Sequence, residues 1–281
     1  MKKTQKPALA AACLFSAPSI LMAPALAGPT PVPNPITSAD WTLPSLQVPL
    51  AKVTPKVDGD PLDPAWASAA ITAPLTPSFL EYGTEPAAPH TQVKVLWDPD
   101  FLYVRFECAA TEIYAPYTQH DDPIYKGDAA EVFLDPVGDG RLYYELQSSP
   151  NGAIFDQYIA VTAEPRVNQF GMLVGEVASR DFWPNLSWNC DGLKVTGKVQ
   201  YQGQTVTGWI ADFAIPAKQI LRRAGKTAFE AGTLRANFLR YEWPAVLPDG
   251  KRDLAALNWS TVVRGCPHIS AARMGFLQLQ G

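Results

Sequence analysis

The chain has 281 residues, of which 23 are Lys or Arg and 27 are Asp or Glu, and its formal net charge is −4 at pH 7. This acidic balance argues against polyanions as partners, so we expect neither nucleic acid nor anionic membrane binding. After residue 27 no window is apolar over the ~20 residues of a membrane-spanning helix, so we expect no transmembrane segment in the mature chain.

The first 27 residues have the three parts of a secretory signal peptide. Lysines at positions 2, 3 and 6 form a positive start, residues 8–23 are mostly apolar, and Ala25-Leu26-Ala27 fits a small-x-small cleavage site. We therefore predict cleavage after Ala27 and a secreted or periplasmic mature protein.

Residues 28–50 carry prolines at short intervals and few charges. This composition predicts an extended leader that lacks regular structure up to about Pro49. No comparable linker follows, so we expect residues 51–281 to form one domain.

Period-two alternation of apolar residues predicts strands along this domain. The clearest strands are residues 92–97, 101–108 and 130–135, and further patterns cover residues 142–147, 193–201 and 205–215. Only residues 217–224, after Pro216, are expected to be helical. The fold class is therefore predicted as all-β, an antiparallel β-sandwich of the jelly-roll or immunoglobulin-like kind with little helix.

Three cysteines remain after residue 27. Cys108 shares a predicted strand face with apolar residues, so we expect a buried free thiol. Cys190 and Cys266 stand in loop-like contexts and could form a disulfide, for which the sequence cannot supply the required Cα separation. The histidines are scattered and no pair of cysteines has zinc-site spacing.

The segment from Tyr125 to Asp135 places an aromatic side chain beside a carboxylate. In the predicted strand, residues 130, 132 and 134 take one face, while Glu131, Phe133 and Asp135 take the other. A pyranose packs its C–H bonds on an aromatic face and bonds its hydroxyl groups to acceptors such as a carboxylate. Tyr125 and Glu131 therefore suit a sugar ligand.

Short motifs along residues 53–279 carry a family resemblance. They are VDGDPLDPAW at 57–66, VKVLWDPDFLYV at 93–104, GDAAEVFLDP at 127–136, YYEL at 143–146, WIADFAIP at 209–216, RANFLR at 235–240 and MGFL at 274–277. In this order they resemble carbohydrate-binding module family 9 and the related DOMON-like β-sandwiches. The resemblance implies a secreted, non-catalytic sandwich that holds a terminal sugar between two aromatic side chains.

The resemblance also implies the candidate site residues. Tyr125, six residues before Glu131, matches the first aromatic of the family, and His268 takes the place of the second. Tyr241 and Trp259 are alternatives for that second aromatic. The candidate carbohydrate-binding residues are Tyr125, Glu131, Glu145, Asn237, Arg240 and His268.

One of these residues departs from the family pattern, and for two others the side that faces the ligand is undecided. Glu145 stands where the family has a basic sugar ligand. Asn237 and Arg240 have opposite strand parity, so only one should face the ligand, and we prefer Arg240.

No cofactor is required by this interpretation. Members of family 9 can carry calcium, and Asp128 and Asp135 are candidate ligands of a structural calcium ion, with Glu131 as a third.

The expected function is binding of sugar or polysaccharide ends, in support of carbohydrate catabolism beside glycoside hydrolases. The sequence has no GxSxG elbow, no HExxH motif and no phosphate-binding loop. One alternative is a haem-binding periplasmic electron-transfer module with Met172 or Met274 and His120 or His268 as ligands. Another is a structural envelope module with a degenerate site.

Overall fold

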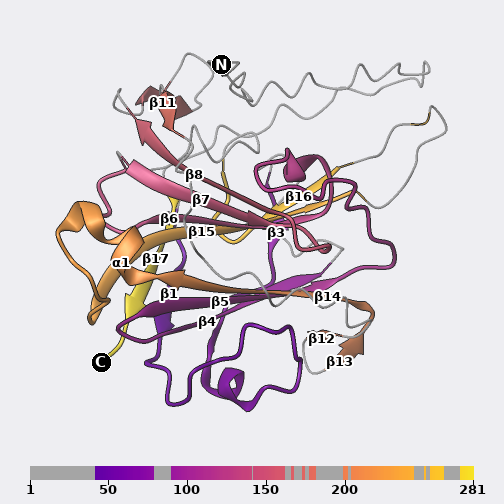
Figure 1. The fold of residues 1–281 in the computed structure, drawn as a ribbon, viewed down its shortest axis with the longest axis horizontal. Helices are drawn as coiled ribbons and strands as arrows, with labels where there is room; N and C mark the ends of the chain where they lie inside the picture. Colours follow the sequence, from indigo (N-terminus) through magenta and orange to yellow (C-terminus); the bar gives the residue numbers. More distant parts are fainter. Residues whose placement is uncertain are drawn as a thin grey trace, which may run out of the picture. The chain divides into compact units, whose positions relative to one another are not determined.

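Two β-sheets face each other across an apolar core in the computed structural model (Figure 1). The structure describes residues 42–78, 90–140, 142–161, 166–167, 173–174, 177–181, 199–201, 204–243, 250, 254–262 and 273–281. The predicted all-β sandwich is confirmed. The predicted signal peptide, most of the predicted leader, and Cys190, Cys266, Met172 and His268 lie outside these residues.

The larger sheet has nine strands. Its main path runs β1 (Ser45–Val48), β17 (Gly275–Leu279), β15 (Gly232–Glu242), β6 (Ala129–Asp135), β7 (Leu142–Ser148), β8 (Ile154–Val161) and β11 (Val177–Asp181). The strand β16 (Ala255–Asn258) pairs with both β15 and β3 (Thr76–Pro77) off this path.

The smaller sheet has the order β14 (Gly208–Pro216), β5 (Phe101–Ala109), β4 (Thr91–Trp97) and β2 (Ala70–Ile71). Two short antiparallel pairs join β9 (Arg166–Val167) to β10 (Leu173–Val174), and β12 (Val199–Tyr201) to β13 (Gln204–Val206). The helical segments in the described part of the chain are η2 (Pro64–Ser68), η4 (Ile124–Lys126), α1 (Ala217–Ile220) and η5 (Arg222–Ala224). Among the described residues no helix has the length and apolar character needed to cross a membrane.

The strand β1 corrects the expected extent of the leader. Residues 45–48 pair in parallel with β17, with Ser45 opposite Phe276 and Val48 opposite Leu279. Pro44 and Pro49 bound the strand instead of interrupting it, because the four residues between them keep their N–H groups. Val48 is fully buried in the core, so these residues belong to the sandwich.

The alternation predicted for β6 is confirmed. Its even-numbered residues, Ala130, Val132 and Leu134, lie in the core between the sheets. Across that core the rings of Phe106 and Phe238 meet edge to face with centroids 6.0 Å apart. The core also encloses Cys108 as a buried free thiol.

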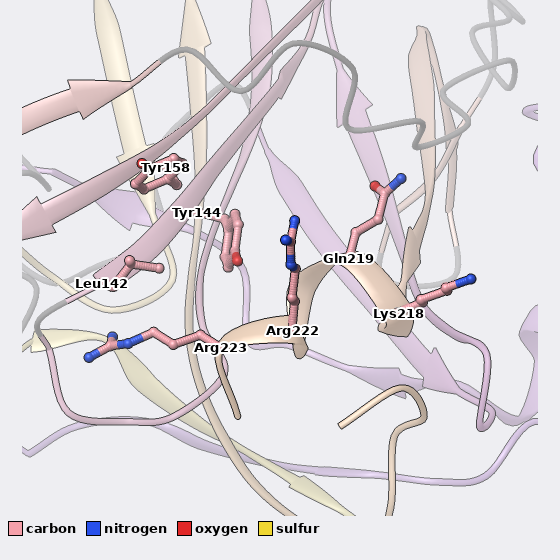
Figure 2. A pocket seen from close by; sticks show the side chains of 7 residues that line it. All are labelled: Leu142, Tyr144, Tyr158, Lys218, Gln219, Arg222 and Arg223. Atoms are coloured by element: carbon pink, nitrogen blue, oxygen red, sulfur yellow. The ribbon is translucent and has the colours of Figure 1, made fainter. Parts of the chain in front are cut away.

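The expected helical stretch is present as two short segments. Pro216 precedes α1, and η5 ends at Gly225, whose φ of 68° lies in the left-handed region that suits glycine. Figure 2 shows side chains of α1 and η5 on one side of a pocket, with Tyr144 of β7 and Tyr158 of β8 on the other.

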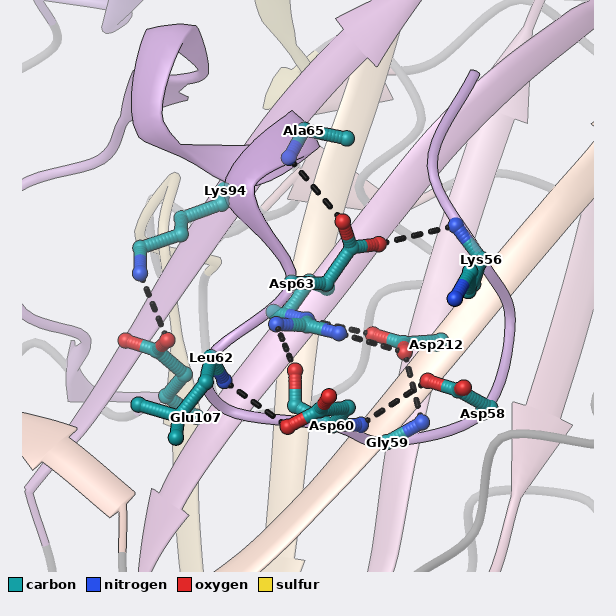
Figure 3. A network of polar contacts seen from close by, with 11 residues as sticks. Lys56, Asp58, Gly59, Asp60, Leu62, Asp63, Ala65, Lys94, Glu107 and Asp212 are labelled. Atoms are coloured by element: carbon teal, nitrogen blue, oxygen red, sulfur yellow. Dashed lines mark hydrogen bonds and ion pairs between the residues drawn. The ribbon is translucent and has the colours of Figure 1, made fainter. Parts of the chain in front are cut away.

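A buried ion pair ties the 57–66 motif to the smaller sheet (Figure 3). The Arg105 guanidinium donates from Nε and Nη2 to the Asp212 carboxylate over 2.6 and 2.7 Å, and both side chains are fully buried. Arg105 Nη1 also donates to the carbonyl of Asp60 over 2.8 Å, and the Gly59 amide donates to Asp212 over 2.9 Å. The guanidinium lies 4.6 Å from the centre of the Trp66 ring. The turn of the motif is therefore fixed by partners far along the chain.

Candidate functional site

The face of the larger sheet that is turned away from the smaller sheet carries a group of polar side chains. We call Glu131, Glu145, Gln147, Gln157 and Tyr241 the outer-face cluster. They come from four neighbouring strands, and each is at most 7% exposed. The strand register explains their meeting, because Glu131 lies opposite Gln147, and Glu145 lies opposite Gln157. The structure therefore brings the predicted Glu131 and Glu145 together.

Hydrogen bonds link the members of the cluster. The Glu131 carboxyl group is hydrogen-bonded to both Glu145 and the Tyr241 hydroxyl. Gln147 Nε2 donates to Glu145 Oε1 over 2.5 Å, and Gln157 Nε2 donates to the other oxygen of Glu145. Ionised carboxylates only accept hydrogen bonds, so a hydrogen bond between Glu131 and Glu145 needs a protonated Glu131 as its donor.

Burial and charge favour the protonated form of Glu131. Burial raises the pKa of Glu131 well above its ordinary 4.5, and the nearby charge of Glu145 raises it further. Burial likewise raises the pKa of Tyr241, so its hydroxyl stays a donor. Glu131 therefore keeps its proton to a higher pH than an exposed glutamate does.

Several buried acceptors of the cluster lack a donor. Glu131 Oε2, Gln147 Oε1 and Gln157 Oε1 have no hydrogen-bond partner among the residues that the structure describes. The same holds for both amide atoms of Asn258, which lies beside Leu239 on β16, on the far side of β15 from β6. Buried polar atoms are normally paired, so this group of atoms is suited to a polar ligand rich in hydroxyl groups.

Aromatic side chains border the cluster on the side of η4. Tyr125 is half-buried and packs against Ala129, Tyr241 and Ala256. The indole Nε1 of Trp243 donates to the Tyr125 carbonyl over 3.2 Å. Of the two alternatives for the second aromatic, Tyr241 therefore lies at the site.

Trp259, the other alternative, belongs to the core. Its ring packs on Phe238 with centroids 5.4 Å apart. His268 lies outside the described residues, so its stacking role stays a prediction.

Asp128 anchors the segment that holds Tyr125. Its carboxylate accepts from the amides of Tyr114 and Trp243, each over 2.8 Å, and it is 1% exposed. The preceding Gly127 passes so close to Tyr114 that a Cβ atom there would lie 2.8 Å from its carbonyl oxygen. A residue without a Cβ atom is therefore favoured at position 127, where the backbone passes close to Tyr114.

The two proposed calcium ligands do not come together. Asp128 directly precedes β6, whereas Asp135 ends it and accepts from the amides of Val137, Gly138 and Gly140. An extended strand advances ~3.3 Å per residue, so the two carboxylates lie roughly 20 Å apart and cannot bind the same ion.

The preference for Arg240 over Asn237 is corrected. Arg240 has even parity in β15 and points toward the smaller sheet, where it donates to Thr91 Oγ1 over 2.8 Å and to the Ala109 carbonyl over 2.7 Å. It also pairs with Glu242. Asn237 does lie on the outer face, but its amide is bonded to the backbone of Ser260 over 2.8 Å in both directions. Neither residue is part of the outer-face cluster.

A further group of potential metal ligands lies apart from the predicted pair. His120, Asp121 and Asp156 offer ligand atoms within 4.8 Å of one another, and His120 Nε2 is 2.7 Å from Asp156 Oδ1. Of the haem candidates, Met274 packs in an apolar cluster with Phe133 and Tyr143 that does not contain His120.

The sequence analysis missed Gln147, Gln157, Asn258 and Trp243. Gln147 carries a usable signal, because it follows Glu145 by two residues and therefore shares its strand face. The other three reach the site only through the order of strands in the sheet.

The raised pKa of Glu131 predicts a pH dependence of stability. In the unfolded chain Glu131 titrates near 4.5, so its contribution to stability is fully present below that pH and is lost as pH rises through the higher folded value. The free energy of unfolding should therefore decline as pH rises. In Glu131→Gln we expect this decline to be smaller by about 1.4 kcal/mol for each unit by which the folded pKa of Glu131 exceeds the unfolded one. Urea unfolding of both proteins between pH 4 and 8 measures the effect.

Glu242 provides the reference for this experiment. Burial raises the pKa of Glu242 to about 7. Because Glu242 is still present in Glu131→Gln, part of the decline in the free energy of unfolding with rising pH should persist in that variant. Equal pH profiles for the two proteins would contradict the proton assigned to Glu131.

The fold and the site define a two-sheet β-sandwich with a polar and aromatic site on one outer sheet face. Residues 57–230 match the family model described as "Carbohydrate family 9 binding domain-like". This match covers more than half of the chain, and the protein belongs to that family.

Solved structures share the fold at low sequence identity. A proposed carbohydrate-binding protein from Bacteroides uniformis is 16% identical, with a TM-score of 0.55 over 85% of this chain and 100% of its own. A carbohydrate binding module family 9 from Caldicellulosiruptor kristjanssonii in complex with cellotriose is 13% identical, with a TM-score of 0.51 over 85% of this chain and 94% of its own. The same module in complex with glucose is 13% identical, with a TM-score of 0.51 over 84% of this chain and 96% of its own. The search of curated proteins returned no match.

Proposed function

We propose that this protein binds a saccharide at the outer-face cluster and does not cleave it. The observation that carries the proposal is a set of buried oxygen and amide atoms that have no hydrogen-bond partner in the described part of the chain, beside a half-buried aromatic ring. Sugar hydroxyl groups both donate and accept, and can therefore satisfy Glu131, Gln147 and Gln157 together. The C–H face of the pyranose would pack on Tyr125.

The spacing of the two carboxyl groups supports binding without hydrolysis. Glycoside hydrolases hold their two carboxyl groups ~5 Å or more apart, on either side of the scissile bond. Glu131 and Glu145 come from the neighbouring strands β6 and β7 and lie close enough for each to affect the titration of Glu131, which is closer than a pair that flanks a scissile bond would be. Both groups can instead form hydrogen bonds with the hydroxyl groups of a bound sugar.

The proposal includes the ligand class and the setting. Glucose and cellotriose, present in the complexes of the C. kristjanssonii module, are the first ligands to test at this site. We further propose that the protein is secreted or periplasmic and acts beside glycoside hydrolases on polysaccharide ends. N-terminal sequencing that finds Gly28 as the first residue would support secretion, and recovery of Met1 would contradict it.

Tyr125→Ala tests the site. Loss of a stacking face costs on the order of 1 kcal/mol or more, so we expect at least about fivefold weaker binding of glucose or cello-oligosaccharides. Titration calorimetry against glucose, cellobiose, xylobiose and their polymers measures it, with unfolding curves to verify the fold.

Phe101→Ala is the matched control for this experiment. Phe101 is a partly buried aromatic residue of the smaller sheet that packs on Tyr103 with ring centroids 5.8 Å apart. Its removal should leave sugar affinity unchanged. The absence of heat with every sugar, or equal losses in the two variants, would contradict the proposed function.

A further inference from the structure

A second pocket opens on the other face of the larger sheet. We call it the basic groove; its lining residues are Leu142, Tyr144, Tyr158, Lys218, Gln219, Arg222 and Arg223. Its volume is about 740 Å³, within the ~300–1,000 Å³ of typical small-molecule sites. Tyr144 and Tyr158 belong to the face of β7 and β8 that packs on the core, opposite to the outer-face cluster. The basic groove is therefore a separate site.

The charged residues that line the basic groove are all cationic. Three of its seven lining residues are cationic and none is acidic, although the whole chain has a net charge of −4. Arg223 pairs with Asp139 at an exposed position, with Nη2 and Oδ2 2.9 Å apart. The charges of Arg222 and Arg223 act to lower the pKa of Tyr144 against the larger effect of burial, so both guanidinium groups lie near its hydroxyl. The groove thus offers a local positive potential.

The opposite wall is aromatic. Tyr144 and Tyr158 are direct cross-strand partners, and Leu142 lies two residues from Tyr144 on the same face. Figure 2 shows the two tyrosines and Leu142 on the sheet side, with Arg222 and Gln219 projecting from the helical side. A ligand in the groove would meet aromatic and apolar surface on one side, and cations with an amide on the other.

These walls fit one class of ligand. A pyranose ring packs its C–H bonds on a tyrosine, and its hydroxyl groups bond to phenol and amide groups. A carboxylate on that ring would bind a guanidinium through two parallel hydrogen bonds, which arginine favours over lysine. We propose that the basic groove is a second ligand site, specific for a saccharide unit that carries a carboxylate, that is, a uronic acid residue.

The proposal extends the proposed function to a second ligand but does not depend on the outer-face cluster. Variants of the two sites distinguish them. Tyr125→Ala should weaken the binding of neutral sugars and leave the binding of uronates unchanged. Arg222→Ala should weaken the binding of uronates and leave the binding of neutral sugars unchanged.

The test is a titration of the full-length protein at low salt with galacturonic acid, glucuronic acid and their disaccharides. Galactose, glucose and inorganic phosphate serve as comparison ligands. We expect saturable binding of at least one uronate and much weaker binding of the comparison ligands. Arg222→Ala should weaken that binding about tenfold or more, and added salt should weaken it further.

Lys226→Ala is the matched control. Lys226 follows η5 in the same exposed stretch and pairs with Glu230 over 2.7 Å, but it does not line the groove. Lys226→Ala removes the same charge as Arg222→Ala, so a loss of uronate affinity caused by net charge alone would appear in both variants. The variants alter exposed side chains, and unchanged melting temperatures would verify their folds.

Three outcomes would overturn the proposal. They are the absence of binding by every uronate, binding of phosphate or neutral sugars at least as tight as that of uronates through Arg222, and equal losses in Arg222→Ala and Lys226→Ala. A selective loss in Arg222→Ala with neutral-sugar binding intact would support the basic groove, even if the outer-face cluster bound nothing.

Discussion

Arg105→Met should lower the free energy of unfolding by about 3–5 kcal/mol. The substitution leaves the fully buried carboxylate of Asp212 without its two strongest donors, while the Asp60 carbonyl also loses a donor. Of the described donors to Asp212, the Gly59 amide alone would remain. Equilibrium unfolding in urea, followed by tryptophan fluorescence, measures the loss.

An exposed pair in the same protein provides the control. Arg223 and Asp139 are also an arginine–aspartate pair, but their side chains are 36% and 33% exposed. Arg223→Met should therefore cost less than about 1 kcal/mol. Similar losses in the two variants would show that burial does not set the strength of the Arg105 contact.

Asp128→Ala should lower both stability and sugar affinity. The change leaves the part-buried amides of Tyr114 and Trp243 without their carboxylate acceptor, at about 1–3 kcal/mol for each lost hydrogen bond to a charged group. Because this carboxylate joins the Tyr125 segment to Trp243, we expect saccharide binding to weaken more than tenfold. Urea unfolding and titration calorimetry on the same preparation give both effects.

Asp122→Ala separates the anchoring role from a general effect of losing an aspartate. Asp122 also accepts from two backbone amides, those of Thr118 and Gln119, over 3.2 and 2.9 Å, but in an exposed turn. Its loss should cost less than about 1 kcal/mol and leave affinity unchanged. A stable Asp128→Ala protein with normal affinity would refute the anchoring role.

Local alternation was enough to predict the sandwich and the orientation of β6. Successive strand residues point to opposite faces, so the apolar residues 130, 132 and 134 had to share the core, and Glu131 had to face away. The same rule left Asn237 and Arg240 undecided, because both are polar and the apolar residues of β15 occupy both faces. Arg240 lies inward because Thr91, Ala109 and Glu242 supply its partners there.

The rest of the site depends on contacts between distant segments. Glu131 and Tyr125 were found because they are six residues apart. Gln157 and Asn258 meet the same site only because β8 lies beside β7, and β16 lies beside β15. Arg105 and Asp212 are likewise 107 residues apart. Neither the strand order nor such a separation leaves a periodic trace in the sequence.

The parallel pairing of β1 with β17 has a mechanical consequence. The chain enters this pair at Ser45 and leaves it at Leu279, which are at opposite ends because the strands run in the same direction. A pulling force applied between residues 42 and 281 would therefore run along both strands and shear them. Their hydrogen bonds, together with those from Phe276 to Pro44 and from Gln280 to Val48, would share the force and have to break together. A domain held by its two ends would thus resist tension at its own boundary strands, instead of opening one bond at a time.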